Sequence, residues 1–443
     1  MTRSKYFRVG ILIAAALASS SCGIFKKGKT GTPVLGERIP VLTGENDLTV
    51  DPATTALPMS LPPSVANNWT QSGGDANKSM GQLALGTSLT RAFTVQAGHG
   101  STLTARLAAE PIVAGNRLFS IDTLGIVRAF DARTGAQLWS SATPIDKKQN
   151  EAEIYGGGLA YDQGRVYATN GLGFVVAMDE ASGRIFWKVR PGGPLRGAPS
   201  VGNGSVYVMS QDDQIYSLKE DDGSTSWSEP ATLEVAGVFG SASPAIGQGT
   251  VVAGFSSGEL NAYRYENGRQ VWGDQLQRTS IRTSVSTLND IDADPVIDNG
   301  QVIAIGAGGR MVALDLITGQ REWEINAAGI STPWLAGDWI FVVTDDAKLL
   351  CVYRQNGHIR WITQMQQFEK PKSKKGQIEY SGPVLAGGRL IVTGSNGALI
   401  FVDPTTGRFL SQTRIGAPVS LSPIVANSTL YILDDRARIT AFR

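Results

Sequence analysis

The stretch Ala313-Leu314-Asp315-Leu316-Ile317-Thr318-Gly319-Gln320-Arg321-Glu322-Trp323 recurs along the chain with one fixed spacing. The clearest copies have a small residue, an Asp two positions later, a Thr-Gly or Ser-Gly pair, and a Trp four residues after that Gly. Weaker copies keep only the small residue, the Gly and the Trp. The other copies place their tryptophans at Trp139, Trp187, Trp227, Trp272 and Trp361. One copy near the end has Ser411 where the aromatic residue is expected, and a last one starts at Ala441. A constant period over this many copies predicts a repeat architecture.

A second signal precedes each copy: a Pro, a short apolar run, a turn with Gly or Asn, and another apolar run. The stretch from Pro295 to Ile305 shows it, with Asn299-Gly300 as the turn. Similar runs begin at Pro111, Pro199, Pro244, Pro333, Pro383 and Pro423, and Gly158 replaces the Pro once. Eight units result, each about the length of a four-stranded antiparallel sheet with tight turns.

The residue types of one unit explain how the units join. Asn-Gly closes a two-residue hairpin because both residues adopt positive φ readily. The Trp of each unit is expected on the outer strand, lying between neighbouring sheets, where a large ring buries much area. A single sheet cannot bury both faces, and radial closure of eight units leaves no long unpaired edge. The sequence therefore predicts an all-β fold, an eight-bladed β-propeller, with a solenoid or separate β-domains as the alternatives.

The last unit lacks its outer strand, because the sequence stops two residues after Ala441. An open edge needs a partner strand. The run from Leu89 to Val95 is the spare strand, so we expect it to complete the eighth blade, with Phe93 in the Trp position. The expected docking aromatics between blades are therefore Phe93, Trp139, Trp187, Trp227, Trp272, Trp323 and Trp361.

The N-terminus has the features of a secretory signal, with basic residues, an apolar run from Val9 to Ala18, and small residues that lead to Cys22. Such a run ending in Cys resembles a bacterial lipobox, which implies that Cys22 is lipidated and that Gly23 directs the protein to the outer membrane. The alternative is an ordinary cleaved signal with an incidental Cys. We expect residues 1–21 to be the signal peptide, 22–66 the lipidated Cys and a flexible tether, and 67–443 the propeller.

Composition excludes several classes of function. The net charge is +1, and no basic stripe interleaved with aromatics appears, which argues against nucleic acid as a partner. Two histidines, His99 and His358, stand at unrelated repeat positions, so neither a metal cluster nor a His-based triad is predicted. Cys351 replaces the small residue of its repeat and is expected to be a core residue. Catalytic residues, a metal and a cofactor are therefore all expected to be absent.

Long connections between units are where binding residues are expected, because loops on a rigid scaffold carry function. One of them, 273–294, contains Asp290, Asp292 and Asp294, alternating with apolar residues. These carboxylates could bind calcium, but the EF-hand pattern is missing and two carboxylates on one face form a weak site. Another connection, 362–382, contains Lys370, Lys372, Lys374 and Lys375, expected to form a solvated tip, with anion or lipid contact as the alternative.

The repeat as a whole resembles that of pyrroloquinoline-quinone-type propellers, over roughly residues 67–443. Within that superfamily, the lipobox, the single propeller and the run from Leu288 to Pro295 resemble the BamB family of outer-membrane assembly lipoproteins. That resemblance implies a non-enzymatic scaffold that faces the periplasm. Its expected partners are the POTRA domains of a BamA-like barrel subunit and other lipoproteins of the assembly complex.

The resemblance also implies a docking patch. The family's Asp-x-Asp-x-x-Pro segment is matched by Asp290, Asp292 and Pro295. A second family segment corresponds to residues 236–240, where Val238 keeps the apolar character and Phe239 replaces an Arg. We expect Val238, Phe239, Asp290 and Asp292 to meet on one face of the disc. The alternative is that the two carboxylates cap their own loop through nearby backbone amides.

Two other classes of function remain open at this point. One is a quinone-dependent dehydrogenase of the same superfamily, but the vicinal cysteines and calcium-binding residues that such enzymes would have are not evident. The other is a propeller that binds glycans or other envelope components.

Overall fold

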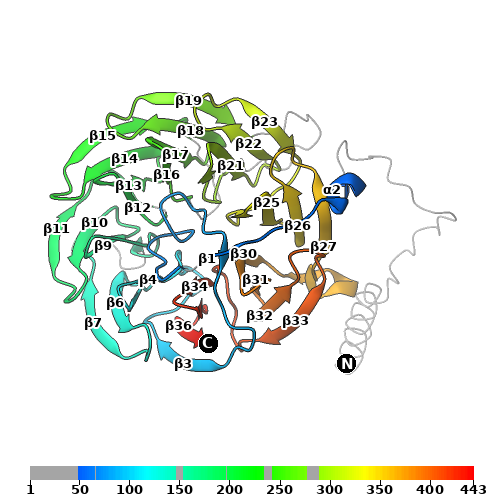
Figure 1. The fold of residues 1–443 in the computed structure, drawn as a ribbon. Coiled ribbons are helices and arrows are strands. Elements are labelled where there is room, and N and C mark those ends of the chain that lie inside the picture. The colour runs from blue at the N-terminus through cyan, green and yellow to red at the C-terminus, as the bar shows by residue number, and fades with distance from the viewer. Residues whose placement is uncertain (1–47, 65, 146–152, 196, 234–241, 277–288) are drawn as a thin grey trace, which may run out of the picture. The chain divides into compact units, whose positions relative to one another are not determined.

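A computed structural model describes residues 48–443, apart from 65, 146–152, 196, 234–241 and 277–288. Its strands form eight four-stranded antiparallel blades arranged in a ring (Figure 1). The predicted eight-bladed β-propeller is therefore confirmed. Cys22, Val238 and Phe239 lie outside the described residues.

Every blade runs from an inner strand at the central axis to an outer strand at the rim. Blades 1 to 4 consist of β4 (Ile112–Ala114), β5 (Arg117–Ile121), β6 (Ile126–Asp131) and β7 (Gln137–Ala142); β8 (Leu159–Asp162), β9 (Arg165–Thr169), β10 (Val175–Asp179) and β11 (Ile185–Val189); β12 (Ser200–Gly202), β13 (Ser205–Met209), β14 (Gln214–Lys219) and β15 (Thr225–Pro230); β16 (Ala245–Gly247), β17 (Thr250–Gly254), β18 (Glu259–Arg264) and β19 (Gln270–Gln275). Blades 5 to 8 consist of β20 (Val296–Asp298), β21 (Gln301–Ile305), β22 (Met311–Asp315) and β23 (Arg321–Ile325); β24 (Trp334–Ala336), β25 (Trp339–Val343), β26 (Lys348–Tyr353) and β27 (Ile359–Gln364); β30 (Tyr380–Ala386), β31 (Arg389–Gly394), β32 (Ala398–Val402) and β33 (Phe409–Arg414); β34 (Ile424–Ala426), β35 (Thr429–Leu433), β36 (Arg438–Phe442) and β3 (Arg91–Gln96).

The repeated turns have the geometry that their residues favour. Asn299 and Gly300 both have positive φ, 47° and 77°, as a tight hairpin between β20 and β21 requires. In the turn after β22, one carboxylate oxygen of Asp315 accepts the N–H of Thr318 at 2.7 Å and its hydroxyl at 2.7 Å. These hydrogen bonds, the hydroxyl first, lower the pKa of Asp315. Asp131, Asp179 and Asp403 accept the same backbone N–H in blades 1, 2 and 7. In blades 3, 4 and 6 the position is occupied by Lys219, Arg264 and Tyr353.

The tryptophans join neighbouring blades as predicted. Trp323 lies opposite Ala313 in the strand register, and Trp139 lies opposite Ala129. The ring of Trp323 covers Gly357 in the turn of the next blade, where a Cβ would be only 2.7 Å from the ring. The indole N–H of Trp139 also donates to the carbonyl of Glu180, in the next blade, at 2.9 Å. Each Trp therefore needs a small residue opposite it on the adjacent strand and a Gly in the turn of the next blade, which explains the spacing of the repeat.

The N-terminal strand β3 completes the eighth blade. Phe93 pairs with Ala441 of β36, which confirms its assignment to the Trp position. The side chain of Phe93 has no N–H to donate to the first blade, so two other groups make the corresponding hydrogen bonds. The hydroxyl of Tyr431 and the guanidinium of Arg443 donate to the carbonyl of Ala132 at 2.9 and 3.0 Å.

The junction between blades 7 and 8 is the one where Ser411 replaces the aromatic residue. Ser411 lies opposite Phe401, the register position of the other tryptophans. The eighth blade has no Asp turn for a Trp to cover, since its outer strand comes from the other end of the chain. Instead, the Arg389 guanidinium of blade 7 donates to the carbonyls of Gly86 and Thr87 at 2.6 and 2.8 Å, just before the chain enters β3.

Residues 66–83, here called the crossing segment, run over the middle of the disc (Figure 1). The segment includes β2 (Gln82–Leu83), which pairs in parallel with β1 (Pro63–Ser64) and with β30. It hydrogen-bonds or pairs with every blade, mostly at the innermost strand. From the first blade to the eighth, the partners are Val113 with Trp69, Tyr161 with Thr70, Val201 with Gln71, Ile246 with Ala76, Ile297 with Asn77, Trp334 with Gly81, Ala386 and Gly387 with Leu83, and Asn427 with Ala66.

The described part of the expected tether, residues 48–64, also lies on the propeller. The N–H of Asp51 donates to the carbonyl of Ile359 at 2.9 Å, and its carboxylate caps the short helix α2 (Pro52–Ala56). The guanidinium of Arg360 donates to the carbonyl of Leu57 at 2.7 Å. The expectation of a flexible tether therefore does not hold for residues 48–64. No helix in the described part of the chain is long and apolar enough to cross a bilayer.

Candidate docking face

The two faces of the disc differ in what they carry. Successive strands are antiparallel, so the connections between blades and the turns between second and third strands lie at the same end. We call this end the loop face. The opposite end, the turn face, has the Asp-x-x-Thr-Gly turns and the crossing segment. Asp290 and Asp292 belong to a connection on the loop face.

The loop face exposes apolar side chains from several connections. Leu103, Ile145, Leu233 and Ile330 lie in connections between blades, and Leu124 lies in the second-to-third turn of the first blade; all five are exposed. Leu233 stands next to the undescribed residues 234–241, which include Val238 and Phe239. Exposed apolar side chains also occur elsewhere, as at Ile317 on the turn face, and only a contiguous apolar patch is typical of a surface that binds another protein.

The carboxylates of the predicted patch are less accessible than the sequence suggested. Asp290 is 1% exposed, and its carbonyl accepts the N–H of Ala307 at 2.9 Å. The next residue, Ile291, is 2% exposed and donates its N–H to the carbonyl of Phe255 in blade 4. Residues 290 and 291 therefore fit between blades 4 and 5. Asp292 is half-buried and lines a central cavity.

Asp294, the third alternating carboxylate, anchors the crossing segment. It is 4% exposed, and its two oxygens accept the Ser243 N–H at 2.7 Å and the Ser72 hydroxyl at 2.6 Å. The ammonium of Lys78 lies 3.9 Å from the same carboxylate. Lys78 is itself 1% exposed, and it donates to the carbonyl of Ser72 at 2.7 Å and to the hydroxyl of Ser200 at 3.2 Å. The sequence analysis did not identify this buried pair, because Lys78 lies outside the repeats.

The central cavity has a volume of about 230 Å³ and a lining of both polar and apolar side chains. Ser72 of the crossing segment contributes to it, together with Glu110 of the first blade and Asp292 and Asp294 of the fifth. Burial raises the pKa of Glu110 to about 7, and the nearby charge of Asp294 adds to this effect. In the part of the chain that the structure describes, no group of three or more metal-binding side chains is found.

The raised pKa makes the protein's stability depend on pH. The folded state holds a proton on Glu110 between pH 4.5 and about 7, where the unfolded state releases it. The contribution of Glu110 to the stability of the fold is therefore fully present below pH 4.5 and is lost as the pH rises through 7. We expect Glu110→Gln to be about 1–3 kcal/mol more stable than the parent at pH 8. Urea unfolding at pH 8 and pH 5 checks this, and a gain of equal size at both values would contradict it.

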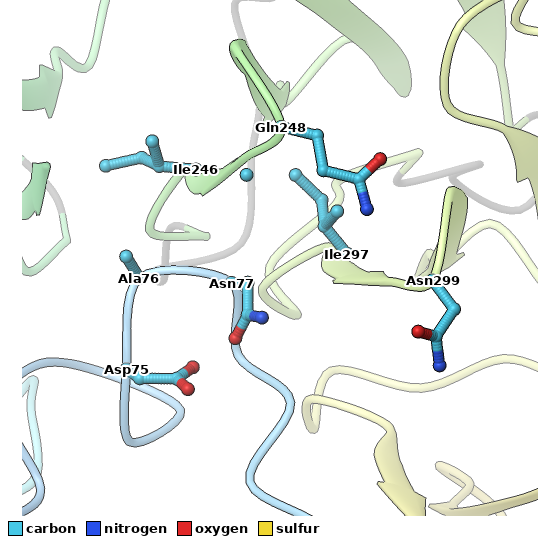
Figure 2. A pocket seen from close by; sticks show the side chains of 8 residues that line it. Asp75, Ala76, Asn77, Ile246, Gln248, Ile297 and Asn299 are labelled. Atoms are coloured by element: carbon cyan, nitrogen blue, oxygen red, sulfur yellow. The ribbon is translucent and has the colours of Figure 1, made fainter. Parts of the chain in front are cut away.

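A second cavity, of about 330 Å³, opens on the turn face between the crossing segment and blades 4 and 5 (Figure 2). Asp75, Ala76 and Asn77 line one side, and the Gln248 and Asn299 side chains come from two hairpin turns. Burial raises the pKa of Asp75. One carboxyl group among amides and apolar atoms offers no nucleophile or acid-base pair, so this cavity has no evident catalytic chemistry.

Cys351 is fully buried opposite Trp361, as expected for a small core residue. Burial raises the pKa of its thiol well above the usual value, so the reactive thiolate form is disfavoured.

Comparison with known proteins decides the family. The model of a family described as outer membrane protein assembly factor BamB matches residues 123–363. The chain belongs to this BamB family. The match runs from the first blade to the outer strand of the sixth and includes both connections of the predicted patch.

Individual BamB proteins show similarity over most of their length. The outer membrane protein assembly factor BamB of Yersinia pestis is 26% identical over 338 residues, which cover 75% of this chain and 83% of that protein. The BamB of Escherichia coli is 26% identical over 327 residues, 73% of this chain and 81% of that protein.

Solved structures show the same fold in proteins of different function. The crystal structure of BamB from Moraxella catarrhalis has a TM-score of 0.67 at 18% identity and covers 80% of this chain and 100% of its own. The quinohemoprotein alcohol dehydrogenase of Comamonas testosteroni has a TM-score of 0.66 at 14% identity and covers 85% of this chain and 80% of its own. At these identities the likeness shows the fold alone. The family match, not the fold, separates the assembly factors from the dehydrogenases.

Proposed function

We propose that this chain is a non-catalytic scaffold lipoprotein of the outer-membrane β-barrel assembly complex. It is anchored to the outer membrane through Cys22, faces the periplasm, and docks through its loop face on the POTRA domains of a BamA-like partner. The family match over residues 123–363, which spans the loops of blades 3 to 5, carries this proposal.

In this proposal the four residues of the docking patch have different roles. The apolar pair Val238 and Phe239 supplies the contact with the partner, and Leu233, exposed in the same connection, adds to it. Asp290, at 1% exposure, holds its connection between two blades. Asp292, half-buried at the cavity, remains a candidate for setting the register of docking. Because it is buried, Asp290 is a weaker candidate for contact with a partner than the half-buried Asp292.

Introducing negative charge at the two apolar residues is expected to weaken docking. We expect Val238→Asp with Phe239→Asp to weaken co-purification with the BamA-like partner at least tenfold and leave the melting temperature unchanged, because a few apolar residues carry most of the affinity of an interface. Ile317→Asp is the matched control, since Ile317 is 73% exposed but lies on the turn face. Undiminished partner binding by the double variant would refute docking through this pair.

The lipid anchor is tested separately. We expect Cys22→Ser to fold with an unchanged melting temperature and to leave the membrane fraction in high salt and mild base. A Ser variant that still sediments with the outer membrane under these conditions would show that the lipid is not what holds the protein there.

A further inference from the structure

An extra hairpin projects from the connection between blades 6 and 7, on the loop face. It consists of β28 (Phe368–Lys370), the short 3-10 helix η2 (Pro371–Ser373) and β29 (Lys375–Gln377). Its base is fixed: the Gln367 amide donates to the carbonyl of Asp346 at 2.8 Å, and the Ile378 N–H donates to the carbonyl of Gln367 at 2.9 Å. The hairpin therefore presents its tip in a defined place.

The tip concentrates positive charge. Lys370, Lys372, Lys374 and Lys375 are all exposed, and Glu369 is the one acidic residue of the hairpin. Lys370 and Lys375 face each other directly across the two strands. Like charges at directly opposed positions destabilise a strand pair, so a negatively charged surface would relieve a repulsion that the free hairpin contains.

None of these lysines has an ion pair in the described part of the chain. Lys78 and Lys348, in contrast, lie beside Asp294 and Asp346. The tip also contains no Arg, the residue whose planar fork suits a fixed carboxylate or phosphate. These flexible ammonium groups do not line a preformed pocket. They are therefore better suited to contact with a planar surface of mobile negative charges than to binding a single anion.

We propose that the hairpin 368–377 is a membrane-surface contact that binds anionic phospholipid headgroups. This assigns a second surface, at blades 6 and 7, beyond the docking patch of blades 3 to 5, and it does not depend on that patch. The attraction is electrostatic, because the tip exposes no large apolar side chain. Binding is therefore screened by salt within about 10 Å at 0.1 M ionic strength.

The test uses residues 22–443 with Cys22→Ser, so that neither a lipid anchor nor the apolar run of the expected signal peptide contributes, and co-sedimentation with vesicles. We expect binding to vesicles that contain phosphatidylglycerol, little binding to phosphatidylcholine alone, and release at high salt. Replacing the four lysines by Gln should weaken binding roughly 10²- to 10³-fold, since each lysine near an anionic surface strengthens it about fivefold. Replacing them by Arg should preserve it.

The matched control removes the same charge from the turn face, with Gln at the exposed residues Arg133, Lys219, Arg264 and Arg269. Equal loss in both quadruple variants would overturn the proposal by showing that net charge alone matters. Loss of binding in inorganic phosphate but not in chloride of equal ionic strength would also overturn it, in favour of a pocket for free phosphate. A hairpin variant that binds vesicles normally but no longer retains the BamA-like partner would assign the lysines to a protein interface.

Discussion

Replacing Trp323 by Ala is expected to lower the free energy of unfolding by about 3–5 kcal/mol, the range for deleting a buried large aromatic side chain. Trp323 is 8% exposed, covers Gly357 of the next blade, and donates its indole N–H to the carbonyl of Arg354 at 2.6 Å. The substitution therefore removes both the packing and one of the hydrogen bonds between blades 5 and 6. Chemical denaturation of the parent and the variant measures the difference.

Two further variants show which part of the contact matters. Trp323→Phe should lose less, since Phe93 occupies the same register position in blade 8 without an N–H. Phe409→Ala, at a side chain 52% exposed on an outer strand, should change stability by no more than about 0.5 kcal/mol. If Trp323→Ala unfolds like Phe409→Ala, the tryptophans do not hold the blades together.

Lys78→Ala is expected to have a comparably large effect, about 3–5 kcal/mol, because it leaves the Asp294 carboxylate buried without its positive partner. The same substitution removes the ammonium that fixes Ser72 and Ser200, and so loosens the crossing segment in the middle of the disc. Urea unfolding at neutral pH measures the loss.

The double variant Lys78→Met with Asp294→Asn separates charge from shape. It removes both charges and keeps similar volumes, so it should recover much of the stability that Lys78→Ala loses. If the double variant is less stable than Lys78→Ala, the ammonium is not compensating the carboxylate, and the buried pair is not what anchors the segment.

The sequence predicted the ring well because the ring is periodic. Phe93 could be assigned to the eighth blade before any coordinates were known, since the repeat left one position empty and one strand unused. The same period identified Ser411 as an exception. Only the structure gave its reason, which is that the eighth blade offers no Asp turn for a Trp to cover.

The crossing segment could not be predicted in the same way. It bonds through backbone groups and through Gln71 and Lys78, and backbone bonding leaves no pattern in the residues. Trp69, 2% exposed and stacked at 6.0 Å on Trp334, is the one strong signal in the segment. A Trp outside the repeat positions, followed by Gln71 and the pair Gly73-Gly74, indicates a buried non-repeat element.

The site was only partly predictable. Alternation of Asp290, Ile291, Asp292 and Ala293 indicates one buried and one exposed face, as on a strand at a sheet surface. Residues 290 and 291 instead lie between blades 4 and 5, so Asp290 is as buried as Ile291. Burial of a carboxylate depends on neighbours that are distant in the sequence, such as Phe255 in the preceding blade, which the local pattern does not contain.

The crossing segment has a consequence for how the protein opens. In a ring where each blade touches only its two neighbours, opening begins at the weakest junction and spreads from there. Here Ser411 marks a junction without a tryptophan, yet blades 7 and 8 are also tied to the common segment through Leu83 and Ala66. The crossing segment bonds to all eight blades, so a blade that separates from its neighbour remains bonded to the centre of the disc. Amide hydrogens of all eight innermost strands should therefore exchange together, at rates set by release of the crossing segment and not by the junction that is nearest.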